Sequence, residues 1–284
     1  MITLAVQKSG RLSEQTFALL QECGIKFNGL SKRSLMINAT NYPLRLLLLR
    51  DDDIPECVND NIAQIGMVGE NTLLEKGFDL KIIERLGYAK CRLSIAVPEK
   101  SVFNSMKDLS GQKIATSYPH ILGKFLDENK IDAEIHEISG SVEIAPGIGL
   151  ANAIFDIVST GSTLITNGLR EVFTVMKSEA VLIQSGQTTT EQISLIEGLI
   201  FRMRAVRTAK DYKYIILNAP NESIDQICSI LPGMKSPTIT PLVTKGWSSL
   251  YSVIEENTFW ENIDKLKKAG AQGILVVPIE KMIM

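Results

Sequence analysis

Short apolar runs alternate with amphipathic segments along most of the chain, and this alternation predicts its elements. Residues 2–6 form an apolar run that predicts a buried strand. Residues 14–23 carry the apolar spacing of a helix, with Ser13 as its N-cap and Gly24 at its end. Because strands that alternate with helices usually form parallel sheets, we expect an α/β fold.

The alternation starts again after a long predicted strand at residues 91–98. A helix is predicted over residues 144–153, followed by a strand over residues 154–158. Strands at residues 172–176 and 180–183 are then expected to return toward the first part of the chain. Two successive α/β units joined by extended crossovers indicate two lobes with a cleft between them.

The tail of the chain has a different order of elements. Its predicted elements are a strand (214–217), a helix capped by Asn221, two strands (238–243 and 248–254), a helix (258–269) capped by Asn257, and a last strand (273–278). This βαββαβ order is that of a ferredoxin-like domain. Small domains of this kind commonly bind effectors or mediate assembly, although the fold alone assigns neither function.

Composition narrows the classes of protein to which the chain can belong. With 284 residues and 45% hydrophobic content, it can bury a large core and is expected to form roughly two or three domains. A net charge of −2 and a pI near 5.9 produce no field that attracts nucleic acid or an anionic membrane. The chain begins directly with a strand pattern and shows no signal-peptide pattern, so we expect a cytoplasmic protein.

Cysteine and histidine usage argues against metal or disulfide chemistry. The cysteines are widely spaced and include no Cys-x-x-Cys pair; they are Cys23, Cys57, Cys91 and Cys228. Neither a zinc site nor a disulfide scaffold is therefore expected. The chain has only 2 histidines, which argues against a catalytic site built on histidine.

A run of small and hydroxylic residues follows the predicted strand at 154–158. Residues 159–163 read Ser-Thr-Gly-Ser-Thr, and a helical pattern starts at Leu164. A strand-to-helix turn of this kind directs backbone N–H groups at one point, where the helix dipole favours an anion, and Gly161 allows close approach. Asp156 lies just upstream, where it can accept hydrogen bonds from sugar hydroxyls. An ordinary loop capped by its own hydroxyls remains the alternative.

Charged and polar residues also follow several other predicted strands. Lys8 and Arg11 lie after the first strand, at the edge where open α/β sheets bind ligands. The remaining candidates at strand ends are Arg50, Glu70, Arg92, Tyr118 and Glu143. Cations beside an anion-binding loop and a sugar-facing acid indicate a phosphorylated sugar ligand. The same groups would also suit a solute-binding protein without catalysis, or simply lie on the surface.

Eight short segments, taken in order, resemble one enzyme family. They are residues 7–12 (QKSGRL), 50–55 (RDDDIP), 69–71 (GEN), 91–94 (CRLS), 114–119 (IATSYP), 140–143 (GSVE), 156–164 (DIVSTGSTL) and 236–242 (SPTITPL). Together they resemble ATP phosphoribosyltransferase, and the resemblance runs from Met1 to Met284. With its C-terminal tail, the chain resembles the long form of that family.

The resemblance implies a reaction and an architecture. Members of the family join ATP and phosphoribosyl pyrophosphate to give N1-(5-phosphoribosyl)-ATP and pyrophosphate with Mg²⁺, in the first step of histidine biosynthesis. The resemblance implies an α/β bilobal catalytic part similar to periplasmic binding proteins, followed by a C-terminal ferredoxin-like (βαββαβ) regulatory domain that binds L-histidine. It also implies AMP and ADP as candidate inhibitors, and a homo-oligomer that exchanges between dimer and hexamer.

The expected domain limits follow from the same resemblance. Residues 1–90 with 178–210 would form the first catalytic lobe, residues 91–177 the second lobe, and residues 211–284 the regulatory domain. No protein ligand is assigned to Mg²⁺, which the substrate phosphates would mainly hold.

The resemblance also implies roles for individual residues. Residues 159–163 would hold the ribose 5-phosphate, Asp156 the ribose hydroxyls, and Lys8 the departing pyrophosphate. The candidates are Lys8, Arg92 and Glu143 as catalytic; Asp156, Ser159, Thr160, Gly161, Ser162 and Thr163 as phosphoribosyl-binding; Arg11, Arg50, Glu70 and Tyr118 as ATP-binding; and Asn218, Met234, Ser236, Thr238 and Gly273 as histidine-binding.

Two positions depart from the family pattern, and two other functions stay open. Gln64 and Asn152 stand where the family often has aspartate, and we expect both to support the loops rather than bind phosphate. A cytoplasmic solute-binding or effector-sensing module of the same bilobal fold is the main alternative. A non-catalytic, partner-dependent paralogue is another, although the intact tail argues against it.

Overall fold

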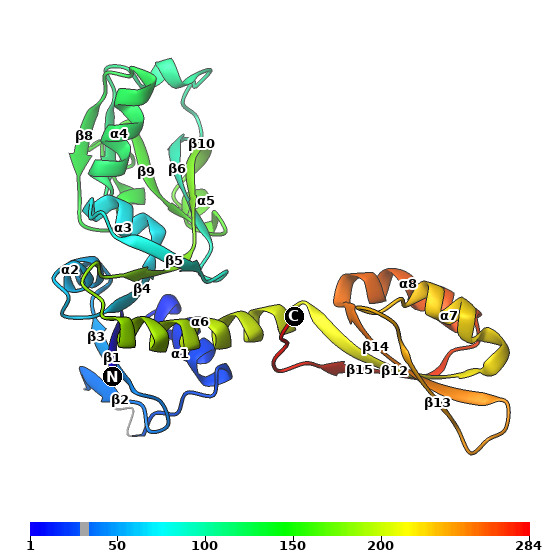
Figure 1. Ribbon diagram of the computed structural model, residues 1–284. Coiled ribbons are helices and arrows are strands. Elements are labelled where there is room, and N and C mark those ends of the chain that lie inside the picture. Colours follow the sequence, from blue (N-terminus) through cyan, green and yellow to red (C-terminus); the bar gives the residue numbers. More distant parts are fainter. Residues whose placement is uncertain (29–33) are drawn as a thin grey trace. The chain divides into compact units, whose positions relative to one another are not determined.

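The computed structural model describes residues 1–28 and 34–284, whose strands form three sheets (Figure 1). The chain divides into two compact units. The first comprises Met1–Gln21 and Ile25–Ile196, and the second comprises Glu22–Gly24 and Glu197–Met284. Two of the sheets belong to the first unit and the third belongs to the second unit.

The first sheet has the strand order β2-β3-β1-β4-β11-β5. Its strands are β1 (Ile2–Gln7), β2 (Met36–Asn38), β3 (Leu44–Leu49), β4 (Ile65–Gly69), β5 (Lys81–Arg85) and β11 (Ala180–Gln184). β1 pairs in parallel with β3 and β4, with Gln7 opposite Leu49 and Val6 opposite Met67. The loops that follow these three strands therefore leave the sheet at one edge.

Two helices, α2 (Ile54–Asn59) and α3 (Glu70–Lys76), pack on one face of this sheet. The buried cluster that joins them to it consists of Ala5, Ile54, Val58, Ala63, Val68, Leu73, Val181 and Ile183. A Cβ atom at Gly66 would lie only 2.8 Å from side-chain atoms of Ile54 and Val58. The absence of a side chain at Gly66 thus allows α2 to approach β4 closely.

The first helix begins earlier than its capping pattern predicts. α1 spans Arg11–Glu22, and Ser13 is buried inside it. The backbone N–H of Glu14 donates to the Gly10 carbonyl at 3.0 Å, so the helical turn already includes Arg11. The expected N-cap at Ser13 is therefore wrong, and Arg11 stands at the start of the helix.

The second sheet has the strand order β10-β6-β9-β7-β8. Its strands are β6 (Cys91–Pro98), β7 (Lys113–Thr116), β8 (Glu134–Glu137), β9 (Ala153–Val158) and β10 (Leu169–Ser178). β7 pairs in parallel with β8 and β9, whereas β6 runs antiparallel to β9 and β10. The helices α4 (Pro119–Asn129) and α5 (Ser162–Thr166) follow the carboxyl ends of β7 and β9.

The helix expected over residues 144–153 does not form. A short 3₁₀ turn, η3 (Val142–Ile144), is followed by irregular turns that lead into β9. Pro146 lacks a backbone donor, and Gly149 has a φ of +75°, outside the helical region. The apolar spacing instead reflects the burial of Ala145 and Ala151 in a cluster beside the sheet.

The chain passes from the second sheet back to the first at Glu179. The expected return of residues 172–176 is wrong, because β10 pairs with β6 in the second sheet. β11 follows at once and pairs with β4 and β5 in the first sheet, as expected for residues 180–183. The long helix α6 (Thr190–Lys210) comes next.

The second unit contains the predicted βαββαβ order. Its elements are β12 (Tyr212–Pro220), α7 (Ile224–Ile230), β13 (Thr238–Pro241), β14 (Trp247–Glu255), α8 (Glu256–Lys268) and β15 (Gln272–Pro278). The strands pair in the order β13-β14-β12-β15, and every pair is antiparallel. α7 starts at Ile224 and α8 at Glu256, so the expected N-caps at Asn221 and Asn257 are wrong.

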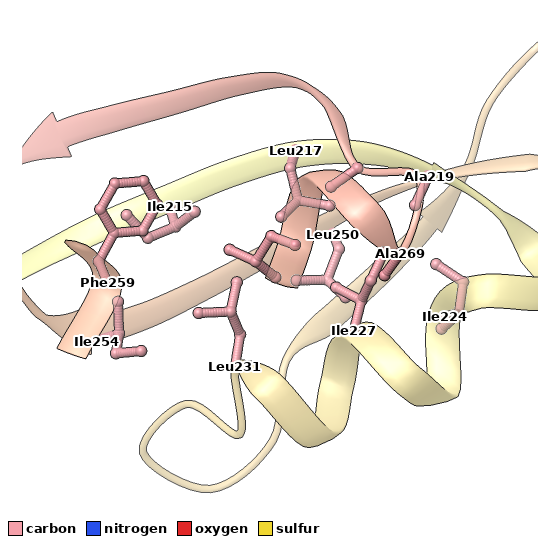
Figure 2. Close-up of a cluster of buried hydrophobic side chains, with 12 residues drawn as sticks. Ile215, Leu217, Ala219, Ile224, Ile227, Leu231, Leu250, Ile254, Phe259 and Ala269 are labelled. Atoms are coloured by element: carbon pink, nitrogen blue, oxygen red, sulfur yellow. The ribbon is translucent and has the colours of Figure 1, made fainter. Parts of the chain in front are cut away.

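This unit has its own hydrophobic core. Figure 2 shows the buried side chains between the sheet and the two helices. Ile215 and Leu217, alternate residues of β12, lie in one buried cluster with Ile227 of α7 and Phe259 of α8. Alternation along β12 therefore directs one set of side chains into the core, as a half-buried strand requires.

These sheets confirm the expected fold class: an α/β part with two sheets, followed by a domain with the ferredoxin-like order βαββαβ. Within residues 1–28 and 34–284, no helix is both long and apolar enough to cross a membrane. The limits of the individual lobes, at residues 90/91 and 177/178, stay a prediction.

Candidate functional site

The parallel strands of the first sheet bring three predicted residues to one edge. Lys8, Arg50 and Glu70 directly follow β1, β3 and β4, and the Lys8 backbone N–H donates to the Leu49 carbonyl at 2.8 Å. Lys8, Arg50 and Arg11 are exposed. In the described part of the chain, none of these three cations forms an ion pair. This edge therefore offers positive charge to an anionic ligand.

Glu70, by contrast, already has a strong partner. Its two carboxylate oxygens accept hydrogen bonds from Arg85 at 2.7 and 2.5 Å, and Arg85 also lies 3.5 Å from Glu179. The hydrogen bonds from Arg85 to Glu70 raise the pKa of Arg85. Glu70 thus lies at the predicted edge as part of an ion pair, and a contact to ATP stays a prediction.

The second sheet brings a second group of predicted residues to one edge. In the parallel pairing of β7 with β9, Thr116 lies opposite Phe155, so Tyr118 and Asp156 lie near the ends of neighbouring strands. Tyr118 directly precedes α4, and Glu143 lies in the η3 turn that follows β8. This edge also carries the segment of residues 159–163, called the hydroxyl loop below.

The hydroxyl loop exposes its four hydroxyl-bearing residues. Ser159, Thr160, Ser162 and Thr163 are all exposed, and α5 begins at Ser162. Gly161 adopts a φ of +83°, a conformation that side chains rarely tolerate, and this reverses the backbone before the helix. The hydroxyls of Thr160 and Ser162 lie 3.0 Å apart. Exposed N–H and O–H donors are what a phosphate group requires.

Asp156 lies beside this loop with an unusual acidity. It is partly buried, and its Oδ1 accepts a hydrogen bond from the Ile157 backbone N–H at 2.7 Å. Burial raises the pKa of Asp156 to about 6, and the charge of Glu143 adds to this, while the hydrogen bond from Ile157 opposes it. Glu143 therefore lies close enough to Asp156 for its negative charge to raise the pKa of Asp156.

Tyr118 lies among groups from several segments. The Asn71 amide of α3 donates to its hydroxyl at 3.4 Å. Burial raises the pKa of Tyr118, and the charge of Asp156 raises it further. Tyr118 therefore stays a neutral hydrogen-bonding phenol near neutral pH. Asn71 was not among the predicted site residues, although it belongs to one of the segments that carried the resemblance.

Arg92 has partners that the sequence did not reveal. Its guanidinium forms a two-point ion pair with Glu171 of β10, at 2.7 and 2.5 Å, and its Nη1 donates to the Ser159 carbonyl at 3.1 Å. Arg92 thus contacts the first residue of the hydroxyl loop. No local pattern indicates Glu171, because it lies 79 residues from Arg92 along the chain.

The two departures from the family pattern hold neighbouring strands. The Gln64 side chain accepts a hydrogen bond from the Thr3 backbone N–H within β1 at 2.9 Å. The Asn152 side chain accepts one from the Lys113 backbone N–H at 3.0 Å, at the start of β7. Both side chains accept hydrogen bonds from strand backbone; their expected support of the loops stays a prediction.

The predicted histidine-binding residues fall in two places in the second unit. Asn218 and Gly273 are neighbours on β12 and β15, and a Cβ atom at Gly273 would lie 3.5 Å from the Asn218 amide nitrogen. Met234 and Ser236 lie in the loop before β13, and Thr238 begins that strand opposite Tyr251 of β14. Histidine binding at these residues stays a prediction.

Within the described residues, no group of three or more His, Cys, Asp or Glu side chains could hold a metal ion. Mg²⁺ commonly binds to one or two carboxylates together with substrate phosphates, and so needs no such group. Asp156 lies just before the hydroxyl loop, and Glu143 is close enough to Asp156 to raise its pKa. These residues therefore fit an ion that arrives with a phosphorylated substrate.

Comparison with known proteins identifies relatives along the whole chain. A family model described as ATP phosphoribosyltransferase matches residues 50–205, and the model of that family's C-terminal domain matches residues 209–281. A relative from Bacteroides thetaiotaomicron, named ATP phosphoribosyltransferase, is 54% identical over 284 residues, which is 100% of both chains. One of the same name from Cytophaga hutchinsonii is 54% identical over 283 residues, 100% of this chain and 99% of its own.

A solved structure extends this similarity to the fold. A chain of the ATP phosphoribosyl transferase (HisG:HisZ) complex from Thermotoga maritima matches with a TM-score of 0.62 at 26% sequence identity. The match covers 72% of this chain and 99% of that one. From the two family models and the full-length relatives we conclude that the chain belongs to the ATP phosphoribosyltransferase family, in the long form that carries the additional C-terminal domain.

Proposed function

We propose that this chain transfers the 5-phosphoribosyl group of phosphoribosyl pyrophosphate to N1 of the adenine of ATP. The products are N1-(5-phosphoribosyl)-ATP and pyrophosphate, and the reaction is the first step of L-histidine biosynthesis. The observation that carries the proposal is the exposed hydroxyl loop beside Asp156, in a member of this family. A solute-binding protein without catalysis is not favoured by relatives that are named as the enzyme.

The phosphoribosyl group would bind at the second edge. The N–H and O–H groups of residues 159–163 hold its 5-phosphate, and Asp156 accepts hydrogen bonds from its ribose hydroxyls. Exposure of the loop hydroxyls supports the first assignment, and the position of Asp156 beside the loop supports the second. Above its pKa of about 6, Asp156 is a carboxylate and can accept from two hydroxyls.

ATP and the leaving pyrophosphate would lie toward the first edge. Lys8 neutralises charge on the pyrophosphate as it departs, and Arg11 and Arg50 bind the triphosphate. Exposure and the lack of ion pairs in the described part of the chain support these roles. Glu70 completes the proposed ATP side at this edge, and Tyr118 joins it from the second edge, where its hydroxyl contacts Asn71 of α3. Glu143 lies beside Asp156 and raises its pKa.

The reaction needs charge stabilisation and positioning more than a strong base. Adenine N1 is unprotonated at neutral pH, and its lone pair forms the new bond to ribose C1. The bond from C1 to the pyrophosphate oxygen breaks with its electron pair, so positive charge develops on the sugar and negative charge on the leaving group. Positioned cations and donors stabilise this distribution.

Mg²⁺ would supply charge neutralisation on the pyrophosphate. We propose that substrate phosphates mainly hold it, with Asp156 and Glu143 as carboxylates that could contribute. Chelation with EDTA should then abolish turnover, and added Mg²⁺ should restore it.

The second unit would act as a regulatory domain, and the protein would form a homo-oligomer that exchanges between dimer and hexamer. L-Histidine would bind at Asn218, Met234, Ser236, Thr238 and Gly273 and inhibit the enzyme, with AMP and ADP as further candidate inhibitors. A matching C-terminal family model supports this role, and a solved relative that is itself a complex supports assembly. As an enzyme of amino-acid biosynthesis, the protein would work in the cytoplasm. The proposed limits of its catalytic lobes are those given above.

The deciding experiment mixes the purified protein with ATP, phosphoribosyl pyrophosphate and Mg²⁺. Formation of product is followed by ultraviolet absorbance, with pyrophosphatase added to remove pyrophosphate. We expect steady turnover that requires both substrates. Substrate binding by calorimetry without any turnover would instead favour a solute-binding protein.

Adding L-histidine to the same assay tests the regulatory domain. We expect inhibition that is lost in Ser236→Ala while the uninhibited rate stays unchanged. An unchanged rate together with no heat of histidine binding would contradict the regulatory role.

A further inference from the structure

Glu171 is bound more extensively than a surface carboxylate requires. Its Oε1 accepts hydrogen bonds from Arg92 Nε at 2.7 Å, Ser94 Oγ at 2.7 Å and Thr174 Oγ1 at 3.0 Å, and its Oε2 accepts from Arg92 Nη2 at 2.5 Å. The hydrogen bonds from Arg92 lower the pKa of Glu171 to about 2, in opposition to its partial burial. Glu171 is therefore ionised at every working pH.

The backbone of β10 is irregular where it presents this carboxylate. Its pairing with β6 shifts register between Glu171 and Phe173, and again between Thr174 and Met176. On a regular strand, residues three apart point to opposite faces, so Glu171 and Thr174 could not meet. The bulge between Glu171 and Phe173 brings both side chains to one face, beside Ser94 of β6. Bulges of this kind commonly re-aim side chains near functional sites.

Arg92 extends this cluster to the hydroxyl loop. Two nitrogens of its guanidinium, Nε and Nη2, bind Glu171, and the third, Nη1, donates to the Ser159 carbonyl at 3.1 Å. A guanidinium is planar and rigid, so fixing two of its nitrogens also fixes the direction of the third. The same rigid guanidinium therefore joins Glu171 to the Ser159 carbonyl.

We propose that Glu171 is a positioning residue that acts through Arg92 to hold the hydroxyl loop in the conformation that binds the substrate phosphate. The proposal rests on the phosphoribosyl-binding role proposed above for that loop. It also means that Arg92 acts through the loop carbonyl, instead of binding a substrate phosphate directly.

Replacing Glu171 should change the binding of phosphoribosyl pyrophosphate in opposite directions, depending on whether Arg92 binds the phosphate directly or holds the loop. If Arg92 contacted a phosphate directly, replacing Glu171 by a neutral residue would free a cation and tighten the binding of phosphoribosyl pyrophosphate. If Glu171 positions the loop, the same replacement loosens the loop and weakens that binding, although the site becomes more positive. Glu171→Gln keeps the shape of the side chain and removes its charge and one acceptor.

The first test is hydrogen–deuterium exchange of the ligand-free protein. In Glu171→Gln we expect amides of residues 159–166 to exchange on the order of tenfold faster, because the charge-assisted hydrogen bonds of Arg92 are weakened. The matched control is Glu134→Gln, which breaks the exposed ion pair of Lys113 with Glu134 (2.9 Å) in the same sheet. Unchanged exchange in the loop of Glu171→Gln would overturn the proposal.

The second test measures KM for each substrate. We expect Glu171→Gln to raise KM for phosphoribosyl pyrophosphate on the order of tenfold, with KM for ATP within about twofold of the wild type. An unchanged or lowered KM for phosphoribosyl pyrophosphate would overturn the proposal. If the wild type shows no turnover, the proposed function fails, while the exchange experiment still decides whether Glu171 positions the loop.

A milder variant covers the case in which Glu171→Gln does not fold. Thr174→Val removes one hydrogen bond to Glu171 Oε1 and leaves the ion pair with Arg92 in place. We expect faster loop exchange and a higher KM for phosphoribosyl pyrophosphate, both smaller than in Glu171→Gln. Wild-type values for both measurements in a folded Thr174→Val would contradict the proposal.

Discussion

Asp156, which we propose to bind the ribose, lowers the stability of the folded chain when it is ionised. Its pKa is about 6 in the folded chain and 3.8 for an ordinary aspartate, mainly because of burial. Between these two values the folded chain keeps a proton that the unfolded chain has lost. Stability therefore falls as the pH rises through this window, and the loss is complete above pH 6.

Asp156→Asn should consequently raise the stability of the protein and lower its catalytic efficiency. Above pH 6 we expect the free energy of unfolding to rise by about 1–2 kcal/mol, discounted for partial exposure, with no gain near pH 4. Since an amide accepts fewer hydrogen bonds from ribose, kcat/KM should fall about tenfold or more. Denaturant unfolding at both pH values and steady-state kinetics test this. A stability gain that does not depend on pH would show that the charge is not its cause.

Wild-type activity should also fall when Asp156 is protonated. We expect kcat/KM for phosphoribosyl pyrophosphate to decrease as the pH drops below about 6, because a neutral carboxyl accepts hydroxyl hydrogen bonds poorly. Asp156→Asn should lack this inflection. A profile with the same inflection in both proteins would assign it to another group.

Lys8 is the residue for which the leaving-group role can be tested most directly. Replacing it with Gln removes one positive charge at the predicted pyrophosphate position. We expect kcat to fall on the order of a hundredfold with a smaller change in KM, because charge on pyrophosphate is greatest in the transition state. The matched control is Lys100→Gln, which removes an exposed charge after the end of β6; because β6 runs antiparallel to β9, that end lies away from the hydroxyl loop. A change confined to KM would make Lys8 a ground-state ligand only.

At the scale of elements, α3 holds the start of α4. The Glu75 carboxylate accepts hydrogen bonds from the backbone N–H groups of His120 and Ile121, at 2.8 and 3.0 Å. Tyr118, the N-cap residue of α4, makes no side-chain capping bond. A carboxylate from a helix of the first sheet thus caps a helix of the second, and it also suits the positive end of the helix dipole.

Glu75→Gln tests this contact. An amide has only one acceptor oxygen, so one of the two N–H groups loses its partner. We expect the free energy of unfolding to fall by about 1 kcal/mol, and KM for ATP to rise several-fold because Tyr118 directly precedes α4. Glu128→Gln, at the opposite end of α4, is the control for loss of charge. Wild-type stability in Glu75→Gln would show that the contact is not formed in solution.

At the scale of the whole molecule, the second unit carries a core of its own. The buried cluster in Figure 2 lies between Ile215 and Ala271 and includes residues of β12, β14 and both helices. The match to a separate C-terminal family model covers residues 209–281. Both observations indicate that this part of the chain can fold independently of the two catalytic sheets.

Residues 209–284 expressed alone should therefore unfold cooperatively. Within this fragment, Leu250→Ala should destabilise by about 2–5 kcal/mol, because it opens a cavity at a fully buried position. Leu275→Ala, at a position that is 56% exposed, is the matched control and should change stability far less. Circular dichroism during heating and denaturation measures both. A gradual unfolding transition in the unmodified fragment would contradict an independent core.

The sequence by itself determined the elements whose formation depends on neighbouring residues. Apolar runs such as residues 91–98 became strands, and the tail order βαββαβ formed as predicted. The hydroxyl loop was visible because its small residues are contiguous. Local rules failed where two of them competed: Arg11 already begins the helix that Ser13 was expected to cap, and Pro146 prevented a helix that apolar spacing favoured.

Only the tertiary structure decided which side chains meet at the predicted site. Glu171 joins Arg92 because β10 pairs with β6, and Glu75 meets the start of α4 because the two helices pack together. These contacts link residues that lie 45 or more positions apart along the chain. The sequence could identify groups able to bind a phosphorylated sugar, since chemistry belongs to each side chain. Their orientation depends on register and packing, which no local pattern records.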